Sequence, residues 1–247
     1  TRLSADVVRS YRICGMADPS STVARAGFPV SRQVLADHVY EALLEWLMDG
    51  RLEPGAAVSI DGMARELDVS PTPVREALAR LEHTGMVRRV ALKGYRVAPV
   101  FTREDFAELM EARLSIEPVN ARLACSRMTP DGLDALKQAV EDLKTAPRGG
   151  TFAEYRSYLE ADERFHQLIA AQANNQFLLA AYNTLGGQIQ RFRLFGGVGI
   201  TDAEQAIAEH QAVLDAMTSG DSEKAAAMMV DHVEKVRGRA MADAPED

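Results

Sequence analysis

The sequence predicts a mostly α-helical protein in which three helices and a small β-hairpin precede an all-α helical bundle. Three observations support this fold class. An apolar run of helical spacing follows a serine and a proline at residues 70–78. Two short alternating runs lie at residues 86–90 and 95–100, and helical periodicity continues from residue 102 almost to the end. Because 247 residues exceed the ~100–200 of a typical domain, we expect two domains.

An amphipathic segment, a turn and a short helix open the N-terminal domain. Residues 39–47 are amphipathic, residues 52–55 (Leu-Glu-Pro-Gly) form a turn signal, and residues 61–67 have the spacing of a second helix. Residues 1–32 are polar and irregular, which favours a flexible lead-in. We therefore place the first domain at residues 33–100.

The third helix is expected to begin at Ser70, which serves as its N-cap. Proline is tolerated in the first helical turn because its missing N–H has no partner there, so Pro71 and Pro73 fit this start. Val74 and Leu78 then fall at i and i+4 on one apolar face. This helix packs on the domain core through that face.

Polar side chains near the start of the third helix lie off its apolar face. Thr72 and Arg75 are close to a helix N-terminus, whose free N–H groups favour phosphate. Gly85 suits a left-handed helix cap, and Gly94 suits the tight turn of a hairpin. These elements predict a winged helix-turn-helix, with the third helix as recognition helix in the major groove and the wing near the minor groove.

The charge of the chain is distributed unevenly. The formal net charge is −8, but residues 1–100 hold 13 Lys and Arg against 12 Asp and Glu, whereas residues 101–247 hold 15 against 24. Residues 71–96 hold six Lys and Arg against two Glu, a net charge of +4. Phosphate contacts need such a basic patch. We expect DNA contacts from Ser70, Thr72, Arg75, Arg80, Arg88, Lys93 and Gly94.

Residues 52–85 also carry a specific motif. It comprises Leu52-x-Pro54-Gly55, then Leu67-x-Val69-Ser70-x-Thr72-Pro73-Val74-Arg75-Glu76-Ala77-Leu78-x-x-Leu81, and Gly85. This order resembles the DNA-binding domain of GntR-type bacterial transcription regulators. The resemblance implies a homodimer on a double-stranded DNA operator of two-fold symmetry. The family commonly has arginine where this chain has Pro71, and many members carry a polar or basic contact residue at the position of Asp61.

The second domain, residues 101–240, is predicted to be an all-α bundle, followed by a tail at residues 241–247. Thr201 and Glu204 form a capping-box pattern, and Pro118 is expected to kink the first helix of the bundle. The expected helices span residues 102–127, 129–145, 152–173, 175–195, 201–219 and 221–240.

Histidines in the bundle suggest a metal site. Asp162 and His166 are spaced i, i+4, so both side chains project from one helix face. His210 and His232 lie on the last two helices, and antiparallel packing would bring their rings together. Three imidazoles and a carboxylate suit a borderline divalent metal. The alternative is that each histidine is a surface residue or a singly hydrogen-bonded polar residue.

Four motifs in the bundle extend the resemblance. They are Arg113-Leu-Ser-Ile-Glu117-Pro118, Asp162-x-x-Phe165-His166, Glu209-His210-x-x-x-Leu214, and His232. Together they resemble the ligand-binding domain of the FadR subgroup of GntR regulators.

The resemblance to the FadR subgroup implies a metal and an effector. It implies a divalent ion on Asp162, His166, His210 and His232, with zinc as first choice and nickel or manganese as alternatives, and a small carboxylate effector that completes the coordination. It also implies that Arg113 clamps the carboxylate through its planar fork. The alternative for Arg113 is a buried ion pair with Glu117, and the two roles are compatible.

Two other functions are weighed against an effector-controlled regulator. Zinc with an open coordination position could activate water for hydrolysis, with Glu163 as base, or the protein could sense metal without an organic effector. The sequence has no nucleophile signature, phosphate-binding glycine loop or nucleotide fingerprint. We therefore expect a DNA-binding transcription regulator, a repressor or an activator, and not an enzyme.

The remaining features concern the location of the protein. Cys14 and Cys125 are its two cysteines, and they lie too far apart in the sequence to suggest a disulfide framework. No apolar run approaches ~18 residues, and the N-terminus lacks a signal pattern. We expect a cytoplasmic protein with no membrane partner.

Overall fold

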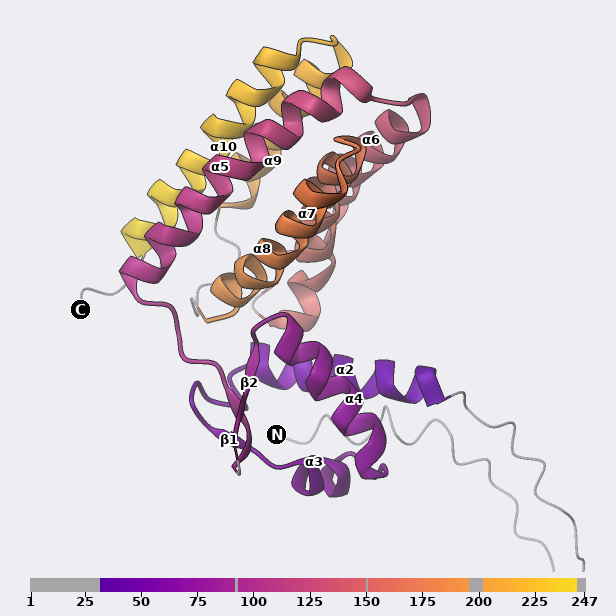
Figure 1. Cartoon of the computed structure of the whole chain (residues 1–247), viewed down its shortest axis with the longest axis vertical. Coiled ribbons are helices and arrows are strands. Elements are labelled where there is room, and N and C mark those ends of the chain that lie inside the picture. The colour runs from indigo at the N-terminus through magenta and orange to yellow at the C-terminus, as the bar shows by residue number, and fades with distance from the viewer. Residues whose placement is uncertain (1–31, 92, 150, 196–201, 244–247) are drawn as a thin grey trace, which may run out of the picture. The chain divides into compact units, whose positions relative to one another are not determined.

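The computed structural model describes residues 32–91, 93–149, 151–195 and 202–243. The predicted lead-in lies outside these residues except for Arg32, where the first helix already begins, and the tail lies outside them from residue 244. The predicted fold class is confirmed: a small three-stranded sheet and short helices precede a helical bundle (Figure 1).

The N-terminal domain is a winged helix-turn-helix. Its elements are α2 (Arg32–Met48), β1 (Ala57–Val58), α3 (Ile60–Glu66), α4 (Pro71–His83), β2 (Val87–Val90) and β3 (Gly94–Val97). The strands form an antiparallel sheet in the order β1-β3-β2, in which Arg96 of β3 lies opposite Arg88 of β2 and Ala57 of β1. The sequence does not predict β1, because two residues are too few to show an alternating pattern.

Helix α4 starts and ends where its sequence predicts. Ser70 is the N-cap with extended backbone and Pro71 is the first helical residue, although the Ser70 side chain makes no capping hydrogen bond. Val74 and Leu78 are fully buried in one cluster with residues of α2. Burial of each such side chain stabilises the domain by roughly 1.5–3 kcal/mol. Gly85 has a φ of 75°, which confirms the predicted left-handed cap.

The C-terminal domain contains only helices among the residues that the structure describes. They are α5 (Arg103–Arg127), α6 (Pro130–Thr145), α7 (Phe152–Gln172), α8 (Gln176–Phe195), α9 (Ala203–Thr218) and α10 (Ser222–Asp243). Helices α5 and α10 run side by side over much of their length (Figure 1). A capping box of Thr102 and Asp105 begins α5, which continues through Pro118 as one helix.

Helix α9 begins differently from the prediction. Asp202 is its N-cap, whereas Thr201 of the predicted capping box lies outside the described residues. The Asp202 carboxylate does not cap the helix and instead accepts a hydrogen bond from Arg239 of α10. Helix α10 ends at Asp243, three residues beyond the predicted end. No helix in the described residues combines the length and apolar character needed to cross a bilayer.

Helices α7 and α8 contact the winged helix-turn-helix. The Phe152 amide of α7 donates to Asp49 Oδ1 at 3.2 Å, and Arg156 pairs with Glu41 of α2. On α8, a Cβ added to Gly187 would lie 2.9 Å from the Cα of Thr84, the C-cap of α4. The backbone of α8 therefore packs directly on the end of the recognition helix.

Candidate metal centre and nucleic-acid interface

The predicted DNA-contacting residues are all exposed. On α4, the Arg75 side chain faces solvent while the neighbouring Val74 is buried, which is the arrangement a recognition helix requires. The seven residues lie along the start of α4, its exposed side and the wing: Ser70, Thr72, Arg75, Arg80, Arg88, Lys93 and Gly94.

Arg80 differs from the other basic residues of this surface because the structure gives it partners. Its Nη1 donates to Asp37 Oδ1 at 2.6 Å, and its guanidinium lies 4.0 Å from the centre of the Tyr40 ring. Both partners belong to α2. A phosphate contact by Arg80 must therefore compete with Asp37, whereas Arg88 and Lys93 project from the wing.

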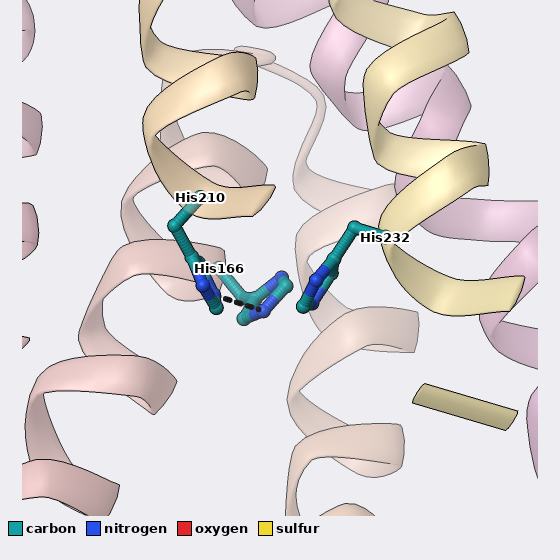
Figure 2. A group of neighbouring side chains, drawn as sticks. All are labelled: His166, His210 and His232. Atoms are coloured by element: carbon teal, nitrogen blue, oxygen red, sulfur yellow. Dashed lines mark hydrogen bonds between the residues drawn. The ribbon is translucent and has the colours of Figure 1, made fainter. Parts of the chain in front are cut away.

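Three histidines from three helices converge in the C-terminal domain. His166 of α7, His210 of α9 and His232 of α10 are at most 3% exposed, and their candidate ligand atoms lie within 4.8 Å of one another (Figure 2). The carboxylate of Asp162 is also buried there, with Oδ1 3.4 Å from His210 Nε2. The structure thus brings the three predicted histidines together, with Asp162 beside His210 but outside the group of mutually close ligand atoms.

The Nδ1 atoms of His210 and His232 each face an acceptor. A carbonyl or carboxylate oxygen beside Nδ1 favours a proton on that nitrogen, which leaves Nε2 with a lone pair that can bind a metal. His210 Nδ1 lies 2.5 Å from the Ala206 carbonyl and His232 Nδ1 lies 2.9 Å from Glu209 Oε2. His166 Nδ1 is 2.8 Å from Glu117 Oε2, but the geometry of this contact is not that of a hydrogen bond.

The Nε2 atoms fit a shared cation. His166 Nε2 and His210 Nε2 lie 3.2 Å apart (Figure 2), and the buried His232 Nε2 has no hydrogen-bond partner. Two facing lone pairs at this distance repel unless a cation or a proton lies between them. Two nitrogens bound at ~2.0–2.1 Å to a tetrahedral zinc ion would be about 3.3 Å apart. The spacing of these two rings therefore suits zinc.

The electrostatics of the centre also favour a cation. Burial and the neighbouring His210 and His166 hold the pKa of His232 well below its usual value, so its ring is neutral at pH 7. The buried charged residues of the described chain are one arginine (Arg113) and three carboxylates (Glu117, Asp162 and Glu209), and all of them lie around this centre. Arg113 pairs with Glu117, and the less buried Arg239 pairs with Glu209, so these three carboxylates and two arginines carry a net charge of −1, which favours a cation.

A cavity of about 20 Å³ adjoins the centre. Its wall comprises Arg113, Leu159, Asp162, Glu163, His166, Tyr182, Gly186 and Ile189.

The predicted ion pair between Arg113 and Glu117 is formed at this cavity, with Arg113 Nε 2.5 Å from Glu117 Oε1. Burial opposes ionisation of Glu117, but Arg113 and then His166 hold its pKa below the usual value. Arg113 Nη1 is buried without a hydrogen-bond partner, so the residue keeps a donor for an anion.

Sequence reasoning missed two residues of the site. Arg239 binds Glu209 behind His232, and its spacing of seven residues from His232 is a signal, since seven residues are about two helical turns. Tyr182 lines the cavity, and burial with the nearby Glu117 raises the pKa of its hydroxyl well above the usual value. Nothing in the local sequence singles out Tyr182.

Comparisons with known proteins agree with this organisation. The family described as "Bacterial regulatory proteins, gntR family" matches residues 35–97, and the FCD domain family matches residues 108–235, about half of the chain. The chain belongs to the GntR family of transcriptional regulators and carries an FCD domain. The two matches coincide with the winged helix-turn-helix and with the bundle that holds the histidines.

Relatives of this GntR regulator are regulators rather than enzymes. It is 28% identical to a probable D-xylose utilization operon transcriptional repressor of Paenarthrobacter nicotinovorans, over 83% of this chain and 88% of the relative. It is 25% identical to the regulator LutR of Bacillus subtilis, over 77% of this chain and 94% of that protein. The FadR-type resemblance is confirmed, and these relatives are named as transcriptional regulators.

Solved structures share the fold of the regulator. Escherichia coli McbR/YncC superposes with a TM-score of 0.64 at 22% identity, over 84% of this chain and 97% of that one. A GntR-type regulator from Rhodococcus sp. RHA1 gives a TM-score of 0.63 at 22% identity, over 85% and 99% of the two chains.

Replacing Arg75 with alanine should reduce operator discrimination without unfolding the protein. An arginine at this exposed position can donate twice to guanine, which contributes roughly 1–3 kcal/mol to the choice of base. Competition between operator and unrelated DNA measures the effect. The control is Arg88→Ala on the wing, which should lower the salt slope of binding by about one unit and leave sequence preference intact. Unchanged preference in Arg75→Ala would remove this residue from base recognition.

Proposed function

We propose that this regulator holds a divalent metal ion and senses a small organic acid at the same centre. Asp162, His166, His210 and His232 would bind the ion, and Arg113 would pair with the acid. The observation that carries the proposal is the convergence of three buried histidines beside a cavity into which a buried arginine brings an unpaired donor.

The chemistry of the cavity favours an anion with oxygen donors. A bound ion supplies positive charge and an open coordination position, and a guanidinium recognises carboxylates through its N–H groups. The cavity of about 20 Å³ has room for little more than a water molecule. An acid must therefore be small, and even so it has to displace part of the wall.

Displacement of the cavity wall would be transmitted to the DNA-binding domain through helix α8. Gly186 of α8 lines the cavity, and the next residue, Gly187, packs on Thr84 at the end of the recognition helix. The two winged helix-turn-helix domains of a dimer can be placed in more than one way relative to each other. An acid that binds two such arrangements with different affinities will change the affinity for the operator. We propose a homodimer whose two recognition helices bind half-sites of a two-fold operator, and which acts as a repressor or an activator.

Calorimetry with zinc-loaded protein tests the proposal. Mono-, di- and tricarboxylates are titrated, with D-xylose as a neutral comparison because the Paenarthrobacter relative is named for it. We expect an acid to bind only in the presence of zinc and to change operator affinity by about 5–150-fold. Binding of neutral compounds alone, or equal acid binding after chelation, would refute the organic-acid site. A response of DNA binding to zinc without any acid would instead indicate a metal sensor.

A further inference from the structure

His232 is held from behind by a glutamate and an arginine. Its Nδ1 lies 2.9 Å from Glu209 Oε2. Arg239 donates to both oxygens of that carboxylate, from Nη1 to Oε1 at 2.7 Å and from Nη2 to Oε2 at 3.1 Å. Its third nitrogen, Nε, donates to Asp202 Oδ2 at 2.6 Å. One guanidinium thus uses all three nitrogens to connect the start of α9 with the last turns of α10.

We infer that Arg239 is a positioning residue for the metal centre. It fixes the Glu209 carboxylate, and Glu209 in turn fixes the proton of His232 on Nδ1 and directs Nε2 toward the other ligands. Partners behind a ligating histidine orient its ring and increase its basicity, and their loss typically weakens metal binding about 10–100-fold. The inference rests on the proposed function, because it requires that an ion binds.

The same contacts set the register of two helices that carry ligands. His210 directly follows Glu209 on α9, and His232 lies seven residues before Arg239 on α10. A bidentate arginine–carboxylate pair has a fixed planar geometry, so it constrains both position and angle. Arg239 therefore constrains α9 and α10 where both late histidines must meet His166.

Arg239 and Arg113 have separate tasks. Arg113 is 1% exposed and lines the cavity, where its Nη1 is available to an acid. The Arg239 side chain is 24% exposed, binds Asp202 near the surface and does not line the cavity. Replacement of Arg239 should consequently weaken metal binding, and should leave acid affinity unchanged once the protein is saturated with metal.

Zinc affinity of the full chain, measured by competition with a chelator, tests the inference. Arg239→Gln keeps a side chain that can form hydrogen bonds, but it removes the positive charge and the two parallel N–H donors that bind both oxygens of Glu209. We expect it to bind zinc about 10–100-fold more weakly than the wild type. Arg237→Gln is the matched control, since Arg237 lies on the same helix and pairs with Glu234 at 2.5 Å in an exposed position. The control should stay within about twofold of the wild type.

A second readout separates positioning from general stability. The rise in melting temperature on zinc addition should shrink in Arg239→Gln and recover in part in Arg239→Lys, which restores the charge but not the fork. A merely structural role would lower the melting temperature of the zinc-free protein and leave zinc affinity unchanged. Equal zinc affinity in wild type and Arg239→Gln would overturn this inference alone. Absence of zinc, nickel and manganese binding by the wild type would overturn the proposed function and this inference with it.

Discussion

Replacing His210 with alanine is expected to abolish tight zinc binding and the thermal stabilisation that zinc provides. The ring is fully buried, and its centre lies 5.1 Å from that of His166 and 4.5 Å from that of His232. It therefore stands next to both other imidazole ligands. A ligand at a thousand times its Kd stabilises the native state by about 4 kcal/mol, and the variant should lose a contribution of this order.

Metal analysis after reconstitution with zinc, nickel and manganese, followed by thermal unfolding with and without metal, measures both losses. His38→Ala is the control, because His38 is exposed on α2 and belongs to the DNA-binding domain. It should retain full occupancy. Near-zero metal content in the wild type as well as in His210→Ala would return the histidines to the role of buried, singly hydrogen-bonded polar residues.

Replacing Arg113 with alanine is expected to cost about 3–5 kcal/mol of folding stability and to eliminate acid binding. The pair with Glu117 is almost fully buried, so the substitution leaves a buried carboxylate without its guanidinium. Acid binding should weaken more than zinc binding, because Arg113 lies at the cavity but is not a metal ligand. Denaturant unfolding and calorimetry measure the two effects.

A double replacement separates the structural role of Arg113 from its role in binding. Arg113→Met with Glu117→Leu exchanges the ion pair for apolar side chains, which often restores or raises stability. The double variant should therefore fold but not bind the acid. Its zinc affinity should fall as well, because Glu117 contacts His166. Acid binding of wild-type strength in this variant would show that Arg113 has no part in effector recognition.

Local signals in the sequence predict the elements that depend on local chemistry. The two prolines after Ser70 are compatible only with a helix start, and α4 begins at Pro71. The spacing of Asp162 and His166 places both on one face of α7, and both are buried at the centre. Such features follow from backbone constraints within a few residues, and for that reason they are visible without a structure.

Features that depend on pairing between distant segments are harder to predict. Strand β1 exists because residues 57 and 58 pair with β3, and two residues carry no pattern of their own. Arg239 binds Glu209, thirty positions earlier, through the packing of α9 on α10. Asp202 follows the same rule, since its carboxylate is directed at Arg239 rather than at its own helix.

Helix α8 has a consequence for how regulators of this design can diversify. Gly186 faces the cavity and Gly187 meets the backbone of Thr84, where an added Cβ would lie 2.9 Å away and no side chain could move aside. At Gly187 the contact with the recognition helix is thus made by the backbone of both helices. Under the proposed function, Tyr182 and Ile189 on the cavity side would be replaced to suit a new effector while that contact stays as it is. Ligand choice and contact with the DNA-binding domain would then belong to different residues of one helix.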